Sequence, residues 1–139
     1  MISEVLKDIN WLAVLAGAIA YFMLGAIWYS FLFKDKWIQY SGVNVNDPNM
    51  KKGVAALMFT SFIMMLITTI GLAIFVEYLG LNGWLYGVKL GLLTGVCFAS
   101  TSMAINMLYE KKPVQLFFIN AGYQVLGTVL AAIIVCSWK

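Results

Sequence analysis

The sequence predicts an all-α integral membrane protein, a bundle of four transmembrane helices. Of the 139 residues, 63% are hydrophobic and only 11% are charged, whereas soluble domains are about 45–50% apolar and about 25% charged. The apolar residues gather in four long uncharged stretches, and the nine lysines lie mainly between them. A soluble fold of this size would leave much of that apolar surface in water, so the composition excludes one.

Each uncharged stretch is long enough to cross a bilayer, which needs about 20 residues. Backbone polar groups in hydrocarbon must bond within their own segment, so each stretch is expected to be helical. The predicted helices cover residues 9–33, 53–77, 84–109 and 113–138. We expect them to form one transmembrane domain that includes residues 1–139.

Capping and turn residues stand at the ends of the predicted helices. Asp8 or Asn10 is suited to cap the first helix. Asp47-Pro48-Asn49 favours a turn before the second predicted helix, and Asn82-Gly83 favours a turn before the third. Aromatic residues also lie at both ends, as they do at the two interfaces of a bilayer. One predicted belt contains Trp11, Tyr78, Trp84, Tyr86 and Trp138, and the other contains Trp28, Tyr29, Trp37, Tyr40 and Tyr109.

The lysines predict the orientation of the chain. More of them lie in the first and third loops than on the opposite side: Lys34, Lys36, Lys51, Lys52, Lys111 and Lys112 against Lys7, Lys89 and Lys139. Cytoplasmic loops carry an excess of lysine and arginine. Loops 34–52 and 110–112 are therefore expected in the cytoplasm, and both termini outside. A short chain without a processing signal suits a multi-pass protein of a cell inner membrane.

Small residues at every fourth position form a groove on the third predicted helix. They are Gly87, Gly91, Gly95 and Ala99. Such a groove lets another helix backbone approach closely. Partner surfaces exist on two other predicted helices, with Ala13, Gly17 and Gly25 on the first and Gly127 and Ala131 on the fourth. These surfaces allow packing within one chain or between copies, and we expect the groove to assemble a homo-oligomer.

Polar side chains gather in the half of the predicted bundle next to the lysine-rich loops. They are Tyr29, Ser30, Ser61, Ser102, Asn106, Asn120, Tyr123 and Gln124. Asn120 and Gln124 share one helix face, and antiparallel neighbours bring Ser102 level with Asn120. Unpaired amides are costly in hydrocarbon. The set is either an interhelical hydrogen-bond clamp, worth about 0.6–2 kcal/mol per contact, or a pocket that binds or passes a neutral solute or a lipid headgroup.

The half of the predicted bundle next to the termini offers few polar side chains. Its uncharged polar residues are Thr68, Thr69 and Thr94, a shortage that favours a closed pocket over an open channel. Glu77 and Lys89 are opposite charges at this end, and a salt bridge between them is one hypothesis. The alternative is that the lysine reaches the interface while the glutamate ends its helix.

The sequence lacks the residues on which most catalytic sites depend. It contains no histidine and no arginine, and no pair of carboxylates within a predicted helix. Cys97 and Cys136 lie in apolar stretches without ligand spacing, so both are interpreted as packing residues. We expect no catalytic residues, no metal and no cofactor. The lysines at helix ends make no continuous basic face, which excludes nucleic acid as a partner.

A short echo links the first and fourth predicted helices. The two segments read Ala20-Tyr21-Phe22-Met23-Leu24-Gly25 and Gly122-Tyr123-Gln124-Val125-Leu126-Gly127. The two helices cross in opposite directions and do not occupy corresponding positions in two-helix halves, as the halves of an inverted repeat do. We therefore interpret the echo as chance similarity.

Several motifs together resemble one family of small membrane proteins. Asn10-Trp11 opens the first predicted helix, Tyr21-x-x-x-Gly25-x-x-Trp28-Tyr29-Ser30 closes it, and Trp37 follows. The fourth carries Ile119-Asn120-Ala121-Gly122-Tyr123-Gln124-x-x-Gly127. Over nearly its whole length the chain is similar to the family known as domain of unknown function seventeen-sixty-one. That resemblance implies a four-helix membrane protein and carries no assigned activity, substrate or cofactor. Members often have proline where this chain has Phe31, which puts any kink there in doubt.

Two functional hypotheses follow from these observations. The first is a non-catalytic homo-oligomeric bundle whose polar cluster binds or conducts a small solute or a lipid headgroup. The second is a structural or regulatory membrane protein in which the same cluster only packs helices. In that case the lysine-rich segment 34–52 would meet a protein partner or anionic lipid headgroups. Membrane lipid is the expected surrounding partner in both.

Overall fold

The structure, a computed structural model, describes residues 2–41 and 53–138. These residues form helices joined by short turns. In chain order the elements are α1 (Ile2–Asp8), α2 (Trp11–Ile27), the π-helical turn η1 (Trp28–Leu32), α3 (Lys34–Ser41), α4 (Val54–Leu79), α5 (Trp84–Thr94), the π-helical turn η2 (Gly95–Ser100), α6 (Thr101–Glu110) and α7 (Val114–Ser137).

Four spans are long and apolar enough to cross a membrane. They are Trp11–Leu32, formed by α2 and η1; Val54–Leu79, which is α4; Trp84–Glu110, formed by α5, η2 and α6; and Val114–Ser137, which is α7. The all-α fold with four transmembrane helices is therefore confirmed. Each observed end lies within two residues of the end predicted from the sequence.

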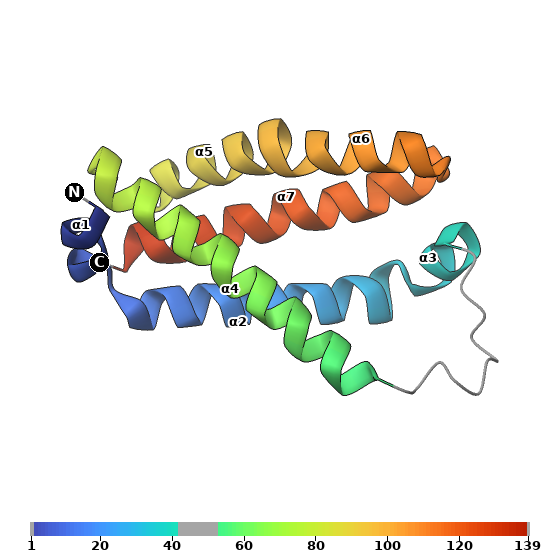
Figure 1. Ribbon diagram of the computed structural model, residues 1–139, viewed down its shortest axis with the longest axis horizontal. Helices are drawn as coiled ribbons and strands as arrows, with labels where there is room; N and C mark the ends of the chain where they lie inside the picture. The colour runs from blue at the N-terminus through green and yellow to red at the C-terminus, as the bar shows by residue number, and fades with distance from the viewer. Residues whose placement is uncertain (1, 42–52, 139) are drawn as a thin grey trace.

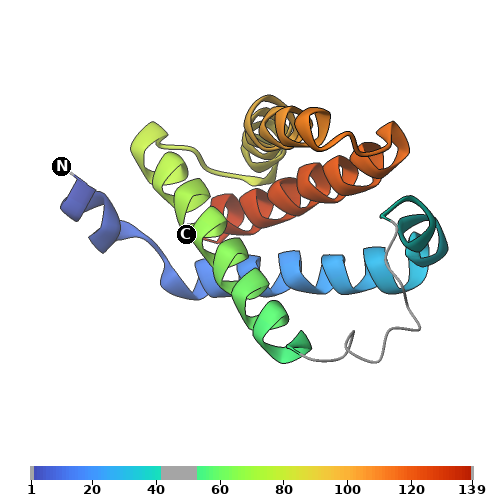
Figure 2. The same ribbon diagram turned by 45° about the vertical axis from the view of Figure 1, so that its right-hand side comes forward.

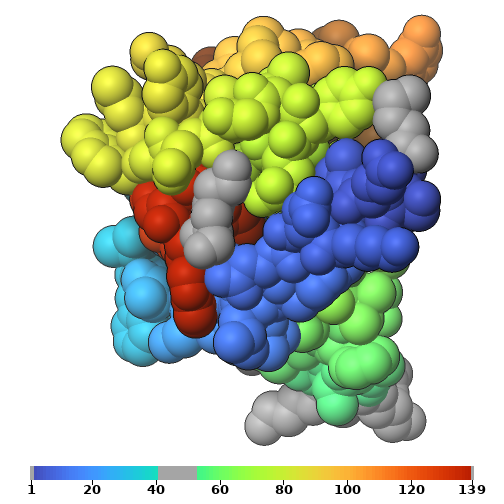
Figure 3. Space-filling view, turned by 90° about the vertical axis from the view of Figure 1, so that its left-hand side faces the viewer, coloured from blue at the N-terminus to red at the C-terminus, as the bar shows by residue number. Residues whose placement is uncertain are grey.

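Three spans run nearly side by side, and the fourth crosses them. In Figure 1, α2, α5–α6 and α7 extend along the molecule, and α4 runs diagonally across it, as it also does in Figure 2. Both chain ends lie with α1 at one end of the bundle, which we call the α1 end, and α3 lies with the α6–α7 turn at the other, the α3 end. Figure 3 views the α1 end, where the last turns of α7, in red, lie between the blue N-terminal helices and the yellow-green segments of α4 and α5.

α7 is the central helix of the bundle. It packs against α2, α4 and α5, and more of its residues are buried than in any other described helix. Cys136 is fully buried there, as a packing residue should be, whereas Cys97 is exposed on η2 and departs from that interpretation. Leu57, Phe59 and Phe118 are each 67% exposed, which suits a surface that faces hydrocarbon rather than water.

The helix ends explain where each span begins and stops. Oδ1 of Asn10 accepts from the N–H groups of Leu12 (3.1 Å) and Ala13 (3.4 Å), so Asn10 is the cap of α2. α4 ends at Gly80 and α6 at Lys111, both in the left-handed conformation that stops a helix. The predicted turn Asp47-Pro48-Asn49 lies outside the described residues.

Two π-helical turns, which were not predicted from the sequence, interrupt the first and third spans. In η1 the N–H of Phe33 donates to the carbonyl oxygen of Trp28, five residues earlier, at 2.9 Å. Such turns insert one extra residue into a helix and are frequent at functional sites. Phe31 lies inside η1, so the span leaves regular α-helical geometry at the position where a kink was in doubt.

Candidate functional site

The glycine groove of the third span faces α7 of the same chain. A Cβ added to Gly87 would lie 2.6 Å from Cα of Ile133, and one added to Gly91 would lie 2.7 Å from the backbone nitrogen of Val129. The Thr128 hydroxyl also donates to the Gly91 carbonyl across this contact, at 3.0 Å. The groove is thus filled within one chain, which corrects the expectation that it joins copies of the chain.

The four-residue repeat of small side chains is interrupted at η2. Gly95 still packs tightly, because an added Cβ would lie 2.9 Å from Cα of Val125. Ala99 lines a hollow between α4 and α5. The neighbouring Ser100 has a buried Oγ with no hydrogen-bond partner in the described chain. The extra residue of the π turn rotates the helix here, so the groove has three members in register rather than four.

A reciprocal pair of tyrosines and glycines joins α2 to α7. A Cβ on Gly127 would lie 2.6 Å from Cδ1 of Tyr21, and one on Gly25 would lie 2.8 Å from the hydroxyl of Tyr123. The two rings meet edge to face with centroids 5.4 Å apart. Both helices carry the motif Tyr-x-x-x-Gly, and because they run antiparallel, the tyrosine of each motif lies opposite the glycine of the other. The echo between these helices, interpreted as chance, is therefore a packing motif.

Hydrogen bonds from tyrosine hydroxyls reinforce the same contact. Tyr29 donates to Oδ1 of Asn120 at 2.7 Å, and Tyr21 donates to Oε1 of Gln124. Tyr123 donates to the carbonyl oxygen of Tyr21 at 3.1 Å. We call these five residues the tyrosine–amide clamp. Three of its bonds cross between the first and fourth spans, so part of the predicted polar set packs helices.

Two members of this contact were not predicted from the sequence. Tyr21 was noted only in the echo and in the family motif, although its spacing of four from Gly25 and of eight from Tyr29 places all three on one helix face. Trp28 was assigned to an interfacial belt. Instead it is half-buried, and its Nε1 donates to the carbonyl oxygen of Ile119 at 3.0 Å.

A hollow of about 400 Å³ opens between α2, α4 and α7, on the α3 side of the point where α4 crosses. A smaller space of about 220 Å³ adjoins it and shares Ser61, Met65 and Gln124. We call the two together the α2–α4 hollow. Five predicted site residues line it: Tyr29, Ser30, Ser61, Tyr123 and Gln124. The rest of the wall is mainly apolar, with Phe22, Ala26, Leu57, Met58 and Met65.

Some polar groups of the α2–α4 hollow make no hydrogen bond within the described residues. On α4, the hydroxyls of Thr60, Thr68 and Thr69 all donate to the carbonyl oxygen four residues earlier. No such bond is recorded for the hydroxyl of Ser61 in the described chain. The amide of Gln124 uses its oxygen in the clamp, so its N–H groups are available to the hollow.

The remaining predicted site residues lie elsewhere. Asn106 and Asn120 line a hollow of about 670 Å³ between α3, α6 and α7, which we call the α6–α7 hollow. Ser102 is exposed on α6 and lines neither hollow. The structure therefore divides the predicted cluster in two, and the bond between Tyr29 and Asn120 stands between the two parts.

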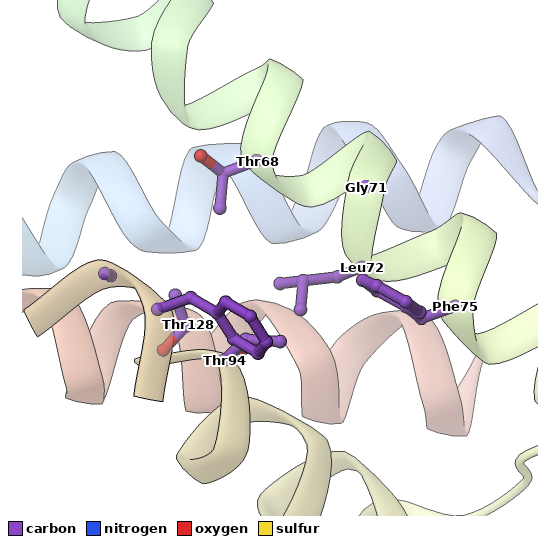
Figure 4. Close-up of a pocket in the computed structure, with 8 residues that line it drawn as sticks. Thr68, Gly71, Leu72, Phe75, Thr94 and Thr128 are labelled. Atoms are coloured by element: carbon purple, nitrogen blue, oxygen red, sulfur yellow. The ribbon is translucent and has the colours of Figure 1, made fainter. Parts of the chain in front are cut away.

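A third hollow, of about 410 Å³, lies between α4, α5 and α7. Figure 4 shows side chains of these helices around it, among them Thr68, Thr94 and Thr128. Their hydroxyls donate to backbone carbonyls of Met64, Leu90 and Gly91, at 3.1, 2.9 and 3.0 Å. This hollow therefore presents mostly apolar groups, including the rings of Phe75 and Phe98.

The charged residues near the α1 end take no part in these hollows. Lys89 extends over the ring of Tyr86, with its Nζ 5.3 Å from the ring centroid. A cation on an aromatic face is a favourable contact by itself. The proposed pairing of Lys89 with Glu77 stays a prediction.

Comparison with known proteins gives a family and no activity. No curated protein and no solved structure matches the chain. A family model described as "Protein of unknown function (DUF1761)" matches residues 12–136, from the first turn of α2 to the last turn of α7. Since the match includes nearly the whole chain and all four spans, the protein belongs to the DUF1761 family.

Proposed function

We propose that the protein is a non-catalytic membrane protein that binds a small uncharged molecule in the α2–α4 hollow. One observation carries the proposal: the Ser61 hydroxyl lines the hollow without the backbone bond that the threonines of its own helix make. An unsatisfied hydroxyl in hydrocarbon costs free energy. A bound partner with a hydroxyl or amide group would recover that cost.

The lining defines the chemistry of the ligand. It contains no charged side chain among the described residues, so an ion would enter without a counter-charge. The hydroxyls of Ser30 and Ser61 and the amide of Gln124 supply hydrogen bonds, while Met58 and Met65 supply apolar contact. These features favour a neutral molecule with one polar end and one apolar end.

Binding fits the lining better than conduction does. Towards the α1 end, Thr68, Thr69 and Thr94 are the polar residues that a path would need. All three hydroxyls are bonded to carbonyls of their own helices, and Thr69 has no exposed surface. A solute that left the hollow in this direction would find few free hydrogen-bonding groups, so we propose a closed site.

A second candidate function is structural or regulatory, and the tyrosine–amide clamp favours it. Its bonds and the reciprocal tyrosine–glycine contact hold α2 against α7. In that case the hollow would be filled only by lipid chains. The segment 34–52 would then bind a protein or anionic headgroups. Its lysines Lys34 and Lys36 are exposed on α3, and Lys51 and Lys52 lie outside the described residues.

Thermal melting of the full chain in phosphatidylcholine nanodiscs separates the two candidates. A monoacylglycerol, which is neutral and carries two hydroxyls, serves as the probe. A ligand that binds the folded state raises the melting temperature as its concentration exceeds the dissociation constant. We expect a rise in the wild type, most of which is lost in Ser61→Ala and kept in Thr60→Ala, the matched control whose hydroxyl is bonded to Ala56. Equal rises in both variants, or none in the wild type, would leave the structural candidate.

Orientation, location and assembly are also proposals. The lysine bias supports cytoplasmic loops at the α3 end, both termini outside, and a cell inner membrane. A reporter enzyme active only outside the cytoplasm, fused after Lys139, is expected to be active. A homo-oligomer stays a prediction, but the glycine groove no longer supports it, because α7 fills that groove.

A further inference from the structure

The α6–α7 hollow has a chemistry that the other hollows lack. Glu110 and Lys112 both line it, whereas the other hollows described above have no charged lining residue. The two residues flank the turn that ends α6 and leads into α7. No ion pair is recorded for either of them within the described chain. The hollow therefore presents an unpaired carboxylate and an unpaired ammonium to one ligand.

Its position is that of a lipid headgroup. The hollow lies at the end of two spans, next to α3, where Lys34, Lys36 and Lys111 also lie exposed. Trp37 of α3 forms one wall, and its ring contacts that of Tyr29 edge to face at 6.0 Å. Tryptophan and lysine at the ends of spans mark the level of headgroups in a bilayer.

The rest of the wall matches the part of a lipid that follows its headgroup. Met103, Met107 and Leu116 are apolar and line the same hollow. The amide oxygen of Asn120 accepts the hydrogen bond from Tyr29, so the N–H groups of the same amide can donate to an anionic oxygen. Asn106 is exposed and adds a second amide. One molecule that joins a cation, an anion and an apolar chain would use all of these groups.

We propose that the α6–α7 hollow binds a zwitterionic phospholipid headgroup of the ethanolamine type, with its ammonium at Glu110 and its phosphate at Lys112 and Asn120. A primary ammonium donates hydrogen bonds to a carboxylate, which a quaternary choline cannot do. An anionic lipid without an amine would leave Glu110 facing a negative charge. The proposal does not rest on a ligand in the α2–α4 hollow, which is a separate space.

Native mass spectrometry of the full chain, released from phosphatidylcholine nanodiscs, tests the proposal. The nanodiscs contain equal minor fractions of phosphatidylethanolamine and phosphatidylglycerol. We expect the wild type to retain phosphatidylethanolamine over phosphatidylglycerol. Glu110→Gln should remove that preference, and Lys112→Gln should lower retention of both lipids by about fivefold.

Matched controls separate a site from general surface charge. Lys111→Gln removes the same charge one residue away, outside the lining, and Glu4→Gln removes a carboxylate at the α1 end. Neither should change retention. A fall in Lys111→Gln equal to that in Lys112→Gln would overturn the proposal, and so would a preference for phosphatidylethanolamine that survives Glu110→Gln.

A lipid series keeps the test independent of how the variants fold. Retention by the wild-type protein is measured for four lipids: phosphatidylethanolamine and its derivatives with one, two or three N-methyl groups. Each methyl removes one ammonium N–H, so retention should fall stepwise along the series. Equal retention of all four lipids would overturn the assignment of the ammonium to Glu110, whatever happens in the variants.

Discussion

The contacts that α7 makes with α5 and with α4 differ in how they are built. Against α5, glycines bring two backbones together, and a single added carbon at Gly91 would lie 2.9 Å from the Thr128 carbonyl oxygen. On the α4 side the chain is open. A Cβ added to Gly71 would meet nothing within 4 Å, and residues 54–60 of α4 are all exposed.

This difference shows what decides helix packing in lipid. Hydrocarbon removes the hydrophobic driving force between helices, so they associate where small residues allow close contact or where polar groups pair. The α5–α7 contact has both, with a glycine groove and the Thr128 bond. The first half of α4 has neither, so it diverges, and the α2–α4 hollow opens along it. The proposed binding site thus results from the loose packing of α4 beside the tightly packed helices α5 and α7.

The largest expected effect is at the glycine groove. Gly91→Ala should destabilise the fold by about 3 kcal/mol, because backbone atoms on both helices must separate. Gly71→Ala is the matched control in open space and should change stability by no more than about 0.5 kcal/mol. Unfolding in bicelles, with both variants measured against the wild type, checks the pair. Similar losses in the two variants would contradict the comparison between tight and open contacts.

The second effect concerns the hydroxyl that crosses the tight contact. Thr128→Val keeps the shape of the side chain but removes the bond to Gly91, at an expected cost of about 1–2 kcal/mol. Thr60→Val removes a hydroxyl that bonds only its own helix, and little change is expected. The same unfolding measurement tests this prediction. An equal loss of stability in the two variants would mean that the interhelical bond does not stabilise the fold.

The clamp should contribute less than the groove. Tyr29→Phe removes the hydroxyl bonded to Asn120 and should cost about 0.6–1.7 kcal/mol, the range of interhelical hydrogen bonds in membranes. A double-mutant cycle with Asn120→Ala isolates the pair. Tyr109→Phe, at a residue that is 86% exposed, serves as the control. A coupling energy of zero would remove Tyr29 from the clamp.

The smallest effect on stability is expected at Ser61. Because its hydroxyl makes no recorded bond in the described chain, Ser61→Ala should lower the free energy of unfolding by no more than about 0.5 kcal/mol without ligand. The variant is then suitable for the binding test. A loss above about 1 kcal/mol would place the Ser61 hydroxyl in helix packing instead.

The sequence predicted the spans well because composition and length alone decide them. An uncharged run of about 20 residues can cross a bilayer only as a helix. The glycine groove was also predicted, but not its partner, because small residues on several helices fit it equally. Only the fold shows that α7 fills the groove and that the first residues of α4 stay exposed.

The candidate site was predicted in composition and not in arrangement. Polar residues in one half of the bundle were identified from their depth along each helix. Their division into two hollows depends on rotation about the helix axes, which η1 and η2 alter by one residue each. Ser102 is an example, since it lies at the expected depth on an exposed face of α6. Lys112 was counted only as a loop lysine and Glu110 was not singled out, because no spacing rule brings them beside Trp37.

The π-helical turn η2 lets the two halves of the third span face α7 with independent angular settings. In a regular helix each residue advances the face by about 100°, so the same residues wound as an uninterrupted α-helix would present α6 turned by that angle. Met107, buried in the wild type, would swing away from α7, while the α5 glycines would stay in place. Length changes elsewhere in this span are therefore tolerated only when η2 is gained or lost with them.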